Sequence, residues 1–298
     1  MQKYLKIADN DVILHVFFVV SGFIRIFVVM KPYTLNVHGR LLDLSRPLVM
    51  GILNSTPDSF FAASRAQTEK AVADRVHAIL AEGGEMIDVG ACSTRPGGVF
   101  VDEMEEKRRL RQALAVIRRE CPDAVVSIDT FRPDVARMAV DEYGADIIND
   151  VSEGVSGEMF KTVAALRVPY ILMSVQSNLH DMLLGFSREV QQLRDLGQKD
   201  IILDPGFGFG KTLEQNYQVL SGMDRLLALG LPVLAGVSRK RMIHQLLEVS
   251  VEDSLNGTTA VHVIALLKGA SILRVHDVRE AVQAVKIVES LRNAGEQR

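Results

Sequence analysis

From Leu35 onward, short apolar runs alternate with longer stretches in which apolar residues recur at every third or fourth position. The short runs are typical of buried strands, and the longer spacing is typical of amphipathic helices. The predicted strands are residues 48–53, 86–89, 125–128, 146–148, 170–173, 201–203, 233–235 and 272–275. The predicted helices are residues 69–83, 101–120, 133–143, 157–166, 216–229, 254–268 and 278–291.

This alternation predicts parallel strands joined by crossover helices, so the expected fold class is α/β. Eight strands favour closure into a (β/α)8 TIM barrel, and an open doubly wound sheet is the alternative. No low-complexity linker divides residues 33–298, and we expect them to form one domain. Residues 33–37 and 40–44, which flank His38 and Gly39, predict a β-hairpin at the bottom of the barrel.

We expect residues 1–32 to be an N-terminal extension outside this domain. Residues 12–29 are strongly apolar, which is also typical of a signal peptide or a membrane anchor. However, His15 and Arg25 interrupt the stretch, and no small-residue cleavage site follows it. We therefore expect a protein without a membrane partner, whose native chain begins at Met30.

The composition fits a folded protein with a large core and excludes some functions. The 298 residues are 48% hydrophobic and 24% charged, and the net charge is −3 without a basic block. This balance argues against a nucleic-acid partner. The two cysteines, Cys92 and Cys121, argue against a disulfide scaffold and fit the reducing cytoplasm.

Most predicted strands run directly into polar or glycine-rich residues. In barrel enzymes the loops at the C-terminal ends of the strands build the active site. One aspartate there is more often a helix cap, but polar groups after seven of the eight strands exceed what capping requires. The side chains concerned are Asn54, Asp58, Thr94, Arg95, Asp129, Asn149, Asp204, Ser238, Arg239, Lys240, Arg274 and His276.

The chemistry of these side chains indicates the kind of ligand. Several cations at one mouth suit a phosphate or pyrophosphate. Asn54 and Asp58 offer oxygens to Mg²⁺, which takes one or two protein oxygens together with water and substrate phosphates. Asp129, Asn149 and Asp204 can pair with a heterocycle that presents adjacent N–H and NH₂ groups. The glycines around Gly208 would let the backbone approach a flat ligand closely.

Five motifs of the chain, at residues 50–60, 93–97, 204–211, 238–240 and 274–277, resemble the dihydropteroate synthases of the pterin-binding enzyme family. The resemblance covers residues 33–289. It implies condensation of 6-hydroxymethyl-7,8-dihydropterin pyrophosphate with 4-aminobenzoate, through early loss of pyrophosphate and a pterin cation. It also implies Mg²⁺ as cofactor, a homodimer, and an enzyme of folate synthesis that sulfonamides target.

The resemblance implies a role for each matching position. Asp129, Asp204 and Lys240 would be the catalytic residues, and Asp129 would stabilise the cation. Asn54 would bind the metal. The remaining positions would bind substrates: Asn149, Met173, Phe207 and Gly208 at the pterin and aminobenzoate, Arg274 and His276 at the pyrophosphate, Ser238 and Arg239 at the aminobenzoate, and Phe60, Thr94, Arg95 and Pro96 from two loops that close over the site.

Three departures from the family pattern stand out. Residues 61–64 replace an acidic, glycine-rich turn, and residues 91–92 replace a common Gly-Glu. After the fifth strand the family's Met-His-Met reads Met173-Ser174-Val175. Residues 176–199 are also short for the family, so we expect a trimmed fifth helix or a trimmed loop before it.

Three other functions remain open at this stage. A pterin-binding paralogue with little or no synthase activity would explain the trimmed fifth unit. A methyltetrahydrofolate-dependent methyltransferase shares the pterin-binding barrel, but it would not need the pyrophosphate cations. A purely structural barrel would gather like charges without a ligand, which is destabilising.

Overall fold

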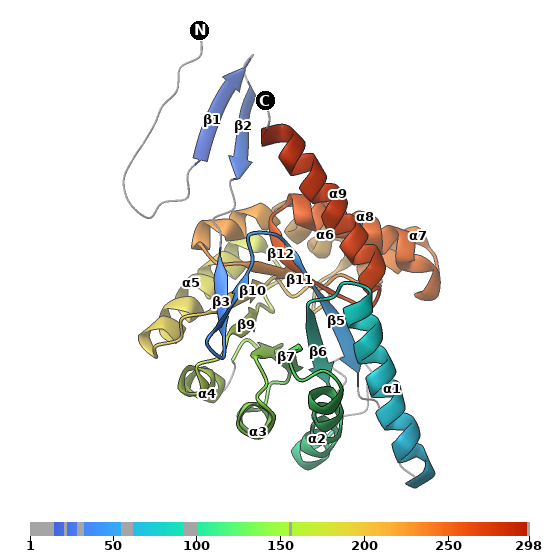
Figure 1. The fold of residues 1–298 in the computed structure, drawn as a ribbon. Coiled ribbons are helices and arrows are strands. Elements are labelled where there is room, and N and C mark those ends of the chain that lie inside the picture. Colours follow the sequence, from blue (N-terminus) through green and yellow to red (C-terminus); the bar gives the residue numbers. More distant parts are fainter. Residues whose placement is uncertain are drawn as a thin grey trace.

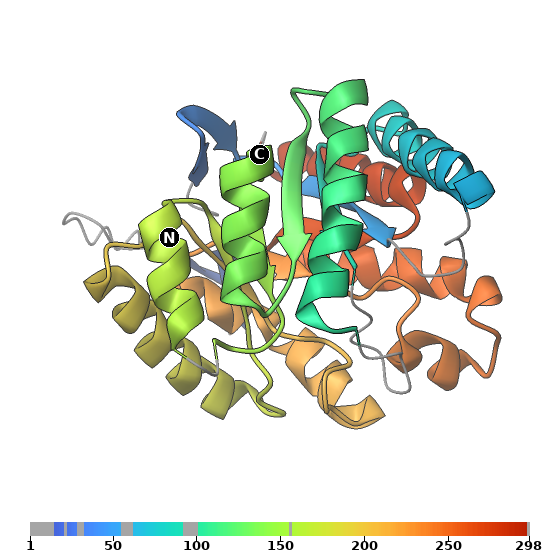
Figure 2. The same ribbon diagram turned by 90° about the horizontal axis from the view of Figure 1, so that it is seen from below.

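The computed structural model describes residues 15–20, 23–28, 33–54, 62–91, 101–154 and 157–296. Eight parallel strands form a closed barrel in the order β10-β11-β12-β5-β6-β7-β8-β9, and helices surround it (Figures 1 and 2). The strands are β5 Leu48–Asn54, β6 Met86–Gly90, β7 Val125–Asp129, β8 Ile147–Asp150, β9 Tyr170–Met173, β10 Ile201–Asp204, β11 Val233–Ala235 and β12 Ala270–Val275. The predicted barrel is thereby confirmed, and the open sheet is excluded.

The helices lie between the strands as crossover connections. They are α1 Ala62–Ala81, α2 Glu103–Glu120, α3 Pro133–Tyr143, α4 Glu158–Leu166, α5 Leu179–Asp195, α6 Leu213–Ser221, α7 Arg241–Leu247, α8 Leu255–Leu267 and α9 Val278–Glu296, with 3-10 helices η1 Met223–Leu229 and η2 Glu252–Ser254. Helix α5 has 17 residues, so the short fifth unit has a full helix and a brief connection, residues 174–178. The predicted ranges did not include α7, and they expected a fifth helix without giving its bounds.

The pattern predicted one helix over residues 216–229, but the structure has two shorter helices there, α6 and η1. Helix α6 begins at Leu213, because Thr212 and Gln215 form a capping box that satisfies the first backbone N–H groups. It ends at Gly222, where the chain continues as η1. A Cβ on Gly222 would lie 2.7 Å from Leu179 Cδ2, so Leu179 of α5 packs directly against this break.

The N-terminal hairpin of β3 (Thr34–Val37) and β4 (Arg40–Asp43) closes the bottom of the barrel, as predicted. Its buried residues Leu35 and Val37 join an inner core layer that contains Leu48, Met50, Met86, Val125, Ile147, Ile171, Ile202, Leu234 and Ile272. Each barrel strand contributes to this layer, so the interior is packed with side chains at this end.

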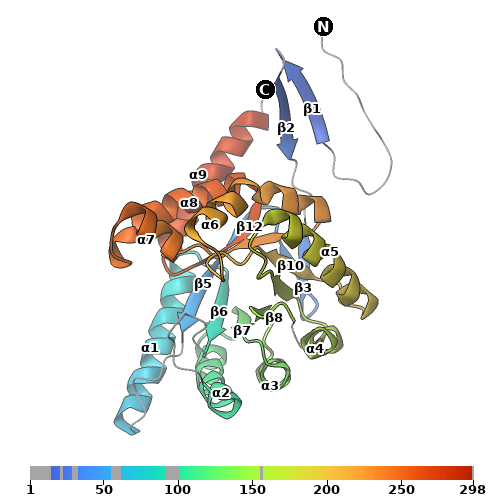
Figure 3. The same cartoon turned by 180° about the vertical axis from the view of Figure 1, so that it is seen from behind.

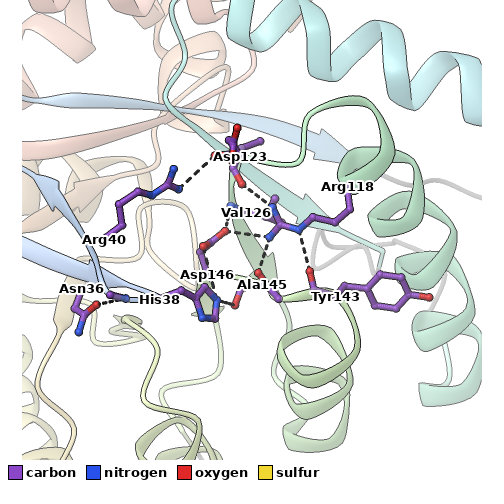
Figure 4. Close-up of polar contacts among 12 residues, drawn as sticks. Asn36, His38, Arg40, Arg118, Asp123, Val126, Tyr143, Ala145 and Asp146 are labelled. Atoms are coloured by element: carbon purple, nitrogen blue, oxygen red, sulfur yellow. Dashed lines mark hydrogen bonds and ion pairs between the residues drawn. The ribbon is translucent and has the colours of Figure 1, made fainter.

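Polar contacts fix the hairpin against the strand starts (Figure 4). His38 Nε2 lies 3.1 Å from the carbonyl oxygen of Ala145 and 3.7 Å from Asp146, and Arg40 donates to the carbonyl of Asp123 at 3.3 Å. Arg118 donates to Asp146 Oδ2 at 3.1 Å, and the backbone N–H of Val126 donates to the same oxygen. The hairpin therefore covers this end of the barrel, so that polar side chains pointing into a site are expected at the opposite end.

Upstream of the barrel, β1 (His15–Val20) pairs antiparallel with β2 (Phe23–Val28). Within the residues that the structure describes, none of the helices combines the length and apolar character needed to cross a membrane.

Candidate active site

The inward-facing residues change from apolar to polar within two positions along the barrel strands. Alternate residues of a strand face the same side, so the residue two positions after each core residue also points inward. Met86 is followed in this way by Asp88, Val125 by Ser127, and Ile147 by Asn149. On the opposite wall Asp204 follows Ile202, and Arg274 follows Ile272. A polar layer therefore lies above the apolar layer, at the C-terminal ends of the strands.

Arg274 links two carboxylates across this layer. Its Nε donates to Asp88 Oδ2 at 2.6 Å, and its NH2 group donates to Asp129 Oδ2 at 2.8 Å. Burial lowers the pKa of the Arg274 guanidinium, but the neighbouring carboxylates outweigh it and hold the pKa above its ordinary value. The cation is therefore permanent, and its contacts fix Asp88 and Asp129 relative to each other.

Asn149 carries the polar atom that most clearly indicates a ligand. Its side chain is 1% exposed, and its Nδ2 donates to both oxygens of Asp88, at 3.4 and 3.2 Å. Its Oδ1 is buried and has no hydrogen-bond partner among the described residues. A buried acceptor without a partner costs about 1 to 3 kcal/mol. A ligand that donates an N–H or O–H here would recover that cost.

Asp129 ends β7 at the mouth of the barrel. Burial raises its pKa to about 7, although the charge of Arg274 opposes the shift. The carboxylates of Asp88, Glu106 and Asp150 raise the pKa further. A buried carboxylate of this kind gains most from a cationic or donor-rich partner.

Asp204 and Lys240 face each other on the opposite wall. A Cβ on Gly236, the residue after β11, would lie 4.0 Å from both Asp204 Oδ2 and Lys240 Nζ. Both charged groups therefore lie next to the C-terminal end of β11. Burial raises the pKa of Asp204, and the charge of Lys240 opposes this. Burial lowers the pKa of Lys240 to about 8, and Asp204 opposes that shift. Lys240 Nζ also donates to the carbonyl of Phe207 and lies 4.8 Å from the centre of the Phe209 ring.

The glycines after β10 approach protein groups closely. Gly208 has φ +83, and a Cβ there would lie 3.2 Å from Lys240 Cδ. Met173 and Phe207 are both fully buried, and a Cβ on Gly206 would lie 3.1 Å from Met173 Cγ. Gly208 therefore makes room for the Lys240 side chain. Met173 and Gly206 lie next to each other at the ends of β9 and β10.

Asn54 ends β5 with an exposed side chain on the same rim. A Cβ on Gly90 would lie 3.7 Å from Asn54 Oδ1 and equally far from Asp129 Oδ2. The amide oxygen of Asn54 therefore faces the mouth near a carboxylate. Among the residues that the structure describes, no group of three or more His, Cys, Asp or Glu side chains could hold a metal ion.

Ser238, Arg239 and His276 lie together beside this cluster. Ser238 Oγ accepts a hydrogen bond from the backbone N–H of His276 at 3.1 Å. Arg239 turns toward Asp277, to which it donates from Nε and NH2 at 2.8 and 2.9 Å. Its NH1 group donates to the carbonyls of Val251 and Glu252. The guanidinium of Arg239 thus joins the loops after β11 and β12, whereas Arg274 and Lys240 face the barrel interior.

The predicted loop residues Phe60, Thr94, Arg95 and Pro96, and the metal candidate Asp58, lie outside the described residues.

The sequence analysis missed Asp88 and Ser127. Asp88 is fully buried and accepts hydrogen bonds from Ser127 Oγ, Asn149 and Arg274. Asp88 interrupts the apolar run 86–89. A charged residue is buried in a strand only where it has a partner, so its position there could have indicated a site residue. Asp88 lies inside β6, two positions before the strand ends, whereas the predicted site residues mostly follow the strands.

Known proteins resemble this chain in sequence and in fold. A family model described as pterin binding enzyme matches residues 50–276. The dihydropteroate synthase of Streptococcus pyogenes is 39% identical over 264 residues, which span 85% of this chain and 98% of the relative.

Solved structures agree with this match. The Xanthomonas albilineans dihydropteroate synthase with 4-aminobenzoic acid has a TM-score of 0.78 at 36% identity, over 88% of this chain and 99% of that chain. The Yersinia pestis enzyme in a sulfonamide drug complex has a TM-score of 0.79 at 36% identity, over 88% of this chain and 100% of that chain.

The barrel, its polar mouth and these relatives show that the chain belongs to the pterin-binding enzyme family. Within that class its function is that of the dihydropteroate synthases, which are transferases.

Proposed function

We propose that the mouth of this barrel condenses 6-hydroxymethyl-7,8-dihydropterin pyrophosphate with 4-aminobenzoate, and releases 7,8-dihydropteroate and pyrophosphate. The observation that carries this proposal is the unpaired, buried Oδ1 of Asn149, beside the carboxylates of Asp88 and Asp129. These acceptors match the adjacent N–H and NH₂ groups of a pterin.

The two walls of the mouth hold opposite edges of the pterin in this proposal. Asn149 and Asp129 accept from one edge, while Asp204 accepts from the other and Lys240 donates to it. Met173 supplies apolar surface for the ring, and Gly208 leaves room for the Lys240 side chain. Pterin binding thus satisfies the acceptors that burial leaves costly.

Asp129 stabilises the transition state. The C–O bond to pyrophosphate breaks first and leaves positive charge on the pterin, and the amine of 4-aminobenzoate then attacks the exocyclic carbon and loses its proton. A fixed carboxylate beside the developing cation lowers the barrier, because its position costs no reorganisation during the reaction. Arg274 holds Asp129 in that position.

Arg274 and His276 bind the leaving pyrophosphate, and Asn54 binds Mg²⁺. The residues present fit this metal, because Mg²⁺ often takes a single protein oxygen together with substrate phosphates and water. The amide oxygen of Asn54 is exposed at the mouth and offers that oxygen. When bound, the metal neutralises charge on the leaving group.

Ser238 and Phe207 contact the 4-aminobenzoate. Arg239 contributes by fixing the adjoining loops through Asp277. Phe60, Thr94, Arg95 and Pro96 close over the substrates and exclude water, which would otherwise trap the cation. Because a sulfonamide resembles aminobenzoate, this subsite is also the proposed target of sulfonamides.

The test is product formation from both substrates with Mg²⁺, paired with calorimetry of a pterin analogue. We expect turnover, and we expect Lys240→Ala to weaken analogue binding. Retained pterin binding without turnover would favour a non-catalytic paralogue, and an unchanged affinity in Lys240→Ala would contradict the role of this lysine. Asn54→Ala should raise the Mg²⁺ concentration needed for half-maximal rate.

We also propose a homodimer in which a second copy covers the outer face of α7, α8 and α9, which lie side by side in Figures 1 and 3. Large apolar side chains are exposed there: Leu246, Leu247, Val249, Val251, Ile264, Leu267, Ile287 and Leu291. Apolar patches of this kind are typical of interfaces. Light scattering should give twice the chain mass for the wild type and less for Ile264→Glu. Leu41→Glu, on the exposed hairpin, is the control that should leave the mass unchanged.

We also propose a domain boundary at residue 33 and a cytoplasmic location. Residues 33–298 form the catalytic unit, and residues 1–32 lie outside it. The family model, which matches residues 50–276, lies entirely within this unit. The free thiol of Cys121 is compatible with a cytoplasmic enzyme. Sequencing the N-terminus of the native protein tests the expected start at Met30, which a mature chain beginning earlier would contradict.

A further inference from the structure

The loops after β9 and β10 are in direct backbone contact at Ser174. The N–H of Ser174 donates to the carbonyl of Asp204 at 2.9 Å. Lys211 Nζ donates to the carbonyls of Ser174 and Gly206, at 3.3 and 2.9 Å. A Cβ on Gly206, whose φ is +64, would lie only 2.2 Å from the carbonyl oxygen of Ser174. Both backbone groups of Ser174 are thus tied to the segment that begins at Asp204.

Glu153, in the loop after β8, holds the same residue from the other side. Its Oε1 accepts from Ser174 Oγ at 3.0 Å and from the N–H of Val175 at 3.1 Å. Glu153 has φ +61, a conformation that residues with a long side chain seldom adopt. The loop therefore holds an unfavourable backbone geometry that directs this carboxylate at Ser174.

Lys211 completes the connection electrostatically. Its side chain is buried, and burial lowers its pKa to about 8, while the charges of Asp204 and Glu153 act in the opposite direction. Asp204 itself is fixed at its carboxylate, because Oδ1 accepts from the N–H of Gly206 at 2.8 Å. A continuous set of polar contacts thus runs from Glu153 through Ser174 and Lys211 to Gly206, whose N–H donates to Asp204.

We propose that Glu153, Ser174 and Lys211 act together as positioning residues that set the orientation of Asp204 toward the pterin. This inference rests on the proposed role of Asp204 in pterin binding. Ser174 and Val175 are the positions where the chain departs from the Met-His-Met pattern of its family. A serine hydroxyl and a carboxylate from the preceding loop here form the contact that anchors the fifth loop.

A removal series in the full-length enzyme tests the proposal. Glu153→Ala removes the acceptor of both hydrogen bonds, and we expect the KM for the pterin substrate to rise on the order of tenfold, as for a lost bond to a charged group. The KM for 4-aminobenzoate should change less than about twofold, within ordinary variation between surface variants. Glu153→Gln retains an acceptor oxygen and should restore most of the affinity.

A double-mutant cycle separates positioning from general loss of stability. Glu153→Ala and Ser174→Ala break the same contact, so the double variant should be no worse than Glu153→Ala alone. Glu158→Gln is the matched control, because this glutamate is exposed on α4 and forms a local ion pair with Lys161. It should leave both KM values unchanged. Equal rises in both KM values, or fully additive effects, would overturn the proposal.

Asp204→Asn distinguishes failure of the inference from failure of the proposed function. If this variant binds a pterin analogue as tightly as the wild type, the role of Asp204 is wrong. If it weakens binding and Glu153→Ala does not, only the positioning inference is overturned. The expected result is that Asp204→Asn weakens binding and that adding Glu153→Ala weakens it little further.

Discussion

Arg274 and Asp88, which are 186 positions apart in the chain, form an ion pair of 2.6 Å at the centre of the barrel mouth. Asp88 is completely buried, and the contact lies between β6 and β12 on either side of β5. A carboxylate at such depth is stable only with a cationic or hydrogen-bonding partner. The pair therefore stabilises the polar layer that contains the proposed catalytic residues.

Asp88→Asn should impair both folding stability and catalysis. The substitution leaves Arg274 with an incomplete set of carboxylate partners, and we expect unfolding to be easier by about 3 kcal/mol, the lower range for breaking a buried pair. Chemical denaturation measures this change. Asp134→Asn is the control, since Asp134 is exposed in the first turn of α3. Wild-type stability in Asp88→Asn would show that the pair contributes nothing.

Asp129→Asn should reduce kcat and leave the fold intact. Asparagine preserves the shape of the side chain but not the negative charge that opposes the pterin cation. Loss of one fixed electrostatic contact of this kind lowers kcat by about 100-fold to 1,000-fold. Single-turnover kinetics on variant and wild type measure the effect, and circular dichroism verifies the fold. A variant with wild-type turnover would exclude the cation-stabilising role.

The pH dependence of kcat/KM should be bell-shaped with a narrow maximum. Burial raises the pKa of Asp129 to about 7, so its carboxylate becomes protonated, and the rate falls, as the pH drops below that value. Burial lowers the pKa of Lys240 to about 8, so its charge and the rate are lost as the pH rises above that value. The profile of kcat/KM reports such groups in the free enzyme. A flat profile from pH 5 to 9 would contradict both assignments.

His262 should make the fold less stable in acid. The side chain is 1% exposed, neither ring nitrogen has a partner among the described residues, and burial lowers its pKa to about 4. Because the unfolded chain binds a proton near pH 6.5 and the folded chain does not, stability falls as the pH drops from about 6.5 to about 4, by about 3 kcal/mol in all.

His262→Leu isolates this contribution. All other titrating groups are shared by the two proteins, so the difference between their unfolding free energies at pH 7 and pH 5 belongs to His262. The variant should lose less stability than the wild type over that interval. Identical losses in urea titrations at the two pH values would show that His262 is not buried in the neutral form.

The order of strands and helices could be read from the sequence because it depends on local patterns. The apolar runs at Tyr170–Met173 and Val233–Ala235 became strands with the predicted bounds, and α3 occupies its predicted range. The same patterns predicted one helix over residues 216–229, whereas the structure has a break at Gly222, which lies against Leu179 of another helix. A contact from so far along the chain leaves no periodic signal at the position that it constrains.

The sequence by itself determined the barrel, the bottom hairpin and the location of polar groups at the strand ends. Only the tertiary structure decided which of these groups meet. Arg239 and Lys240 are neighbours in sequence, yet Arg239 pairs with Asp277 and Lys240 faces Asp204. The reason is that a barrel brings together residues by strand register and by the alternation of inward and outward positions. Closure of the sheet therefore placed Arg274 against Asp88, a pairing that the linear spacing of the two residues does not contain.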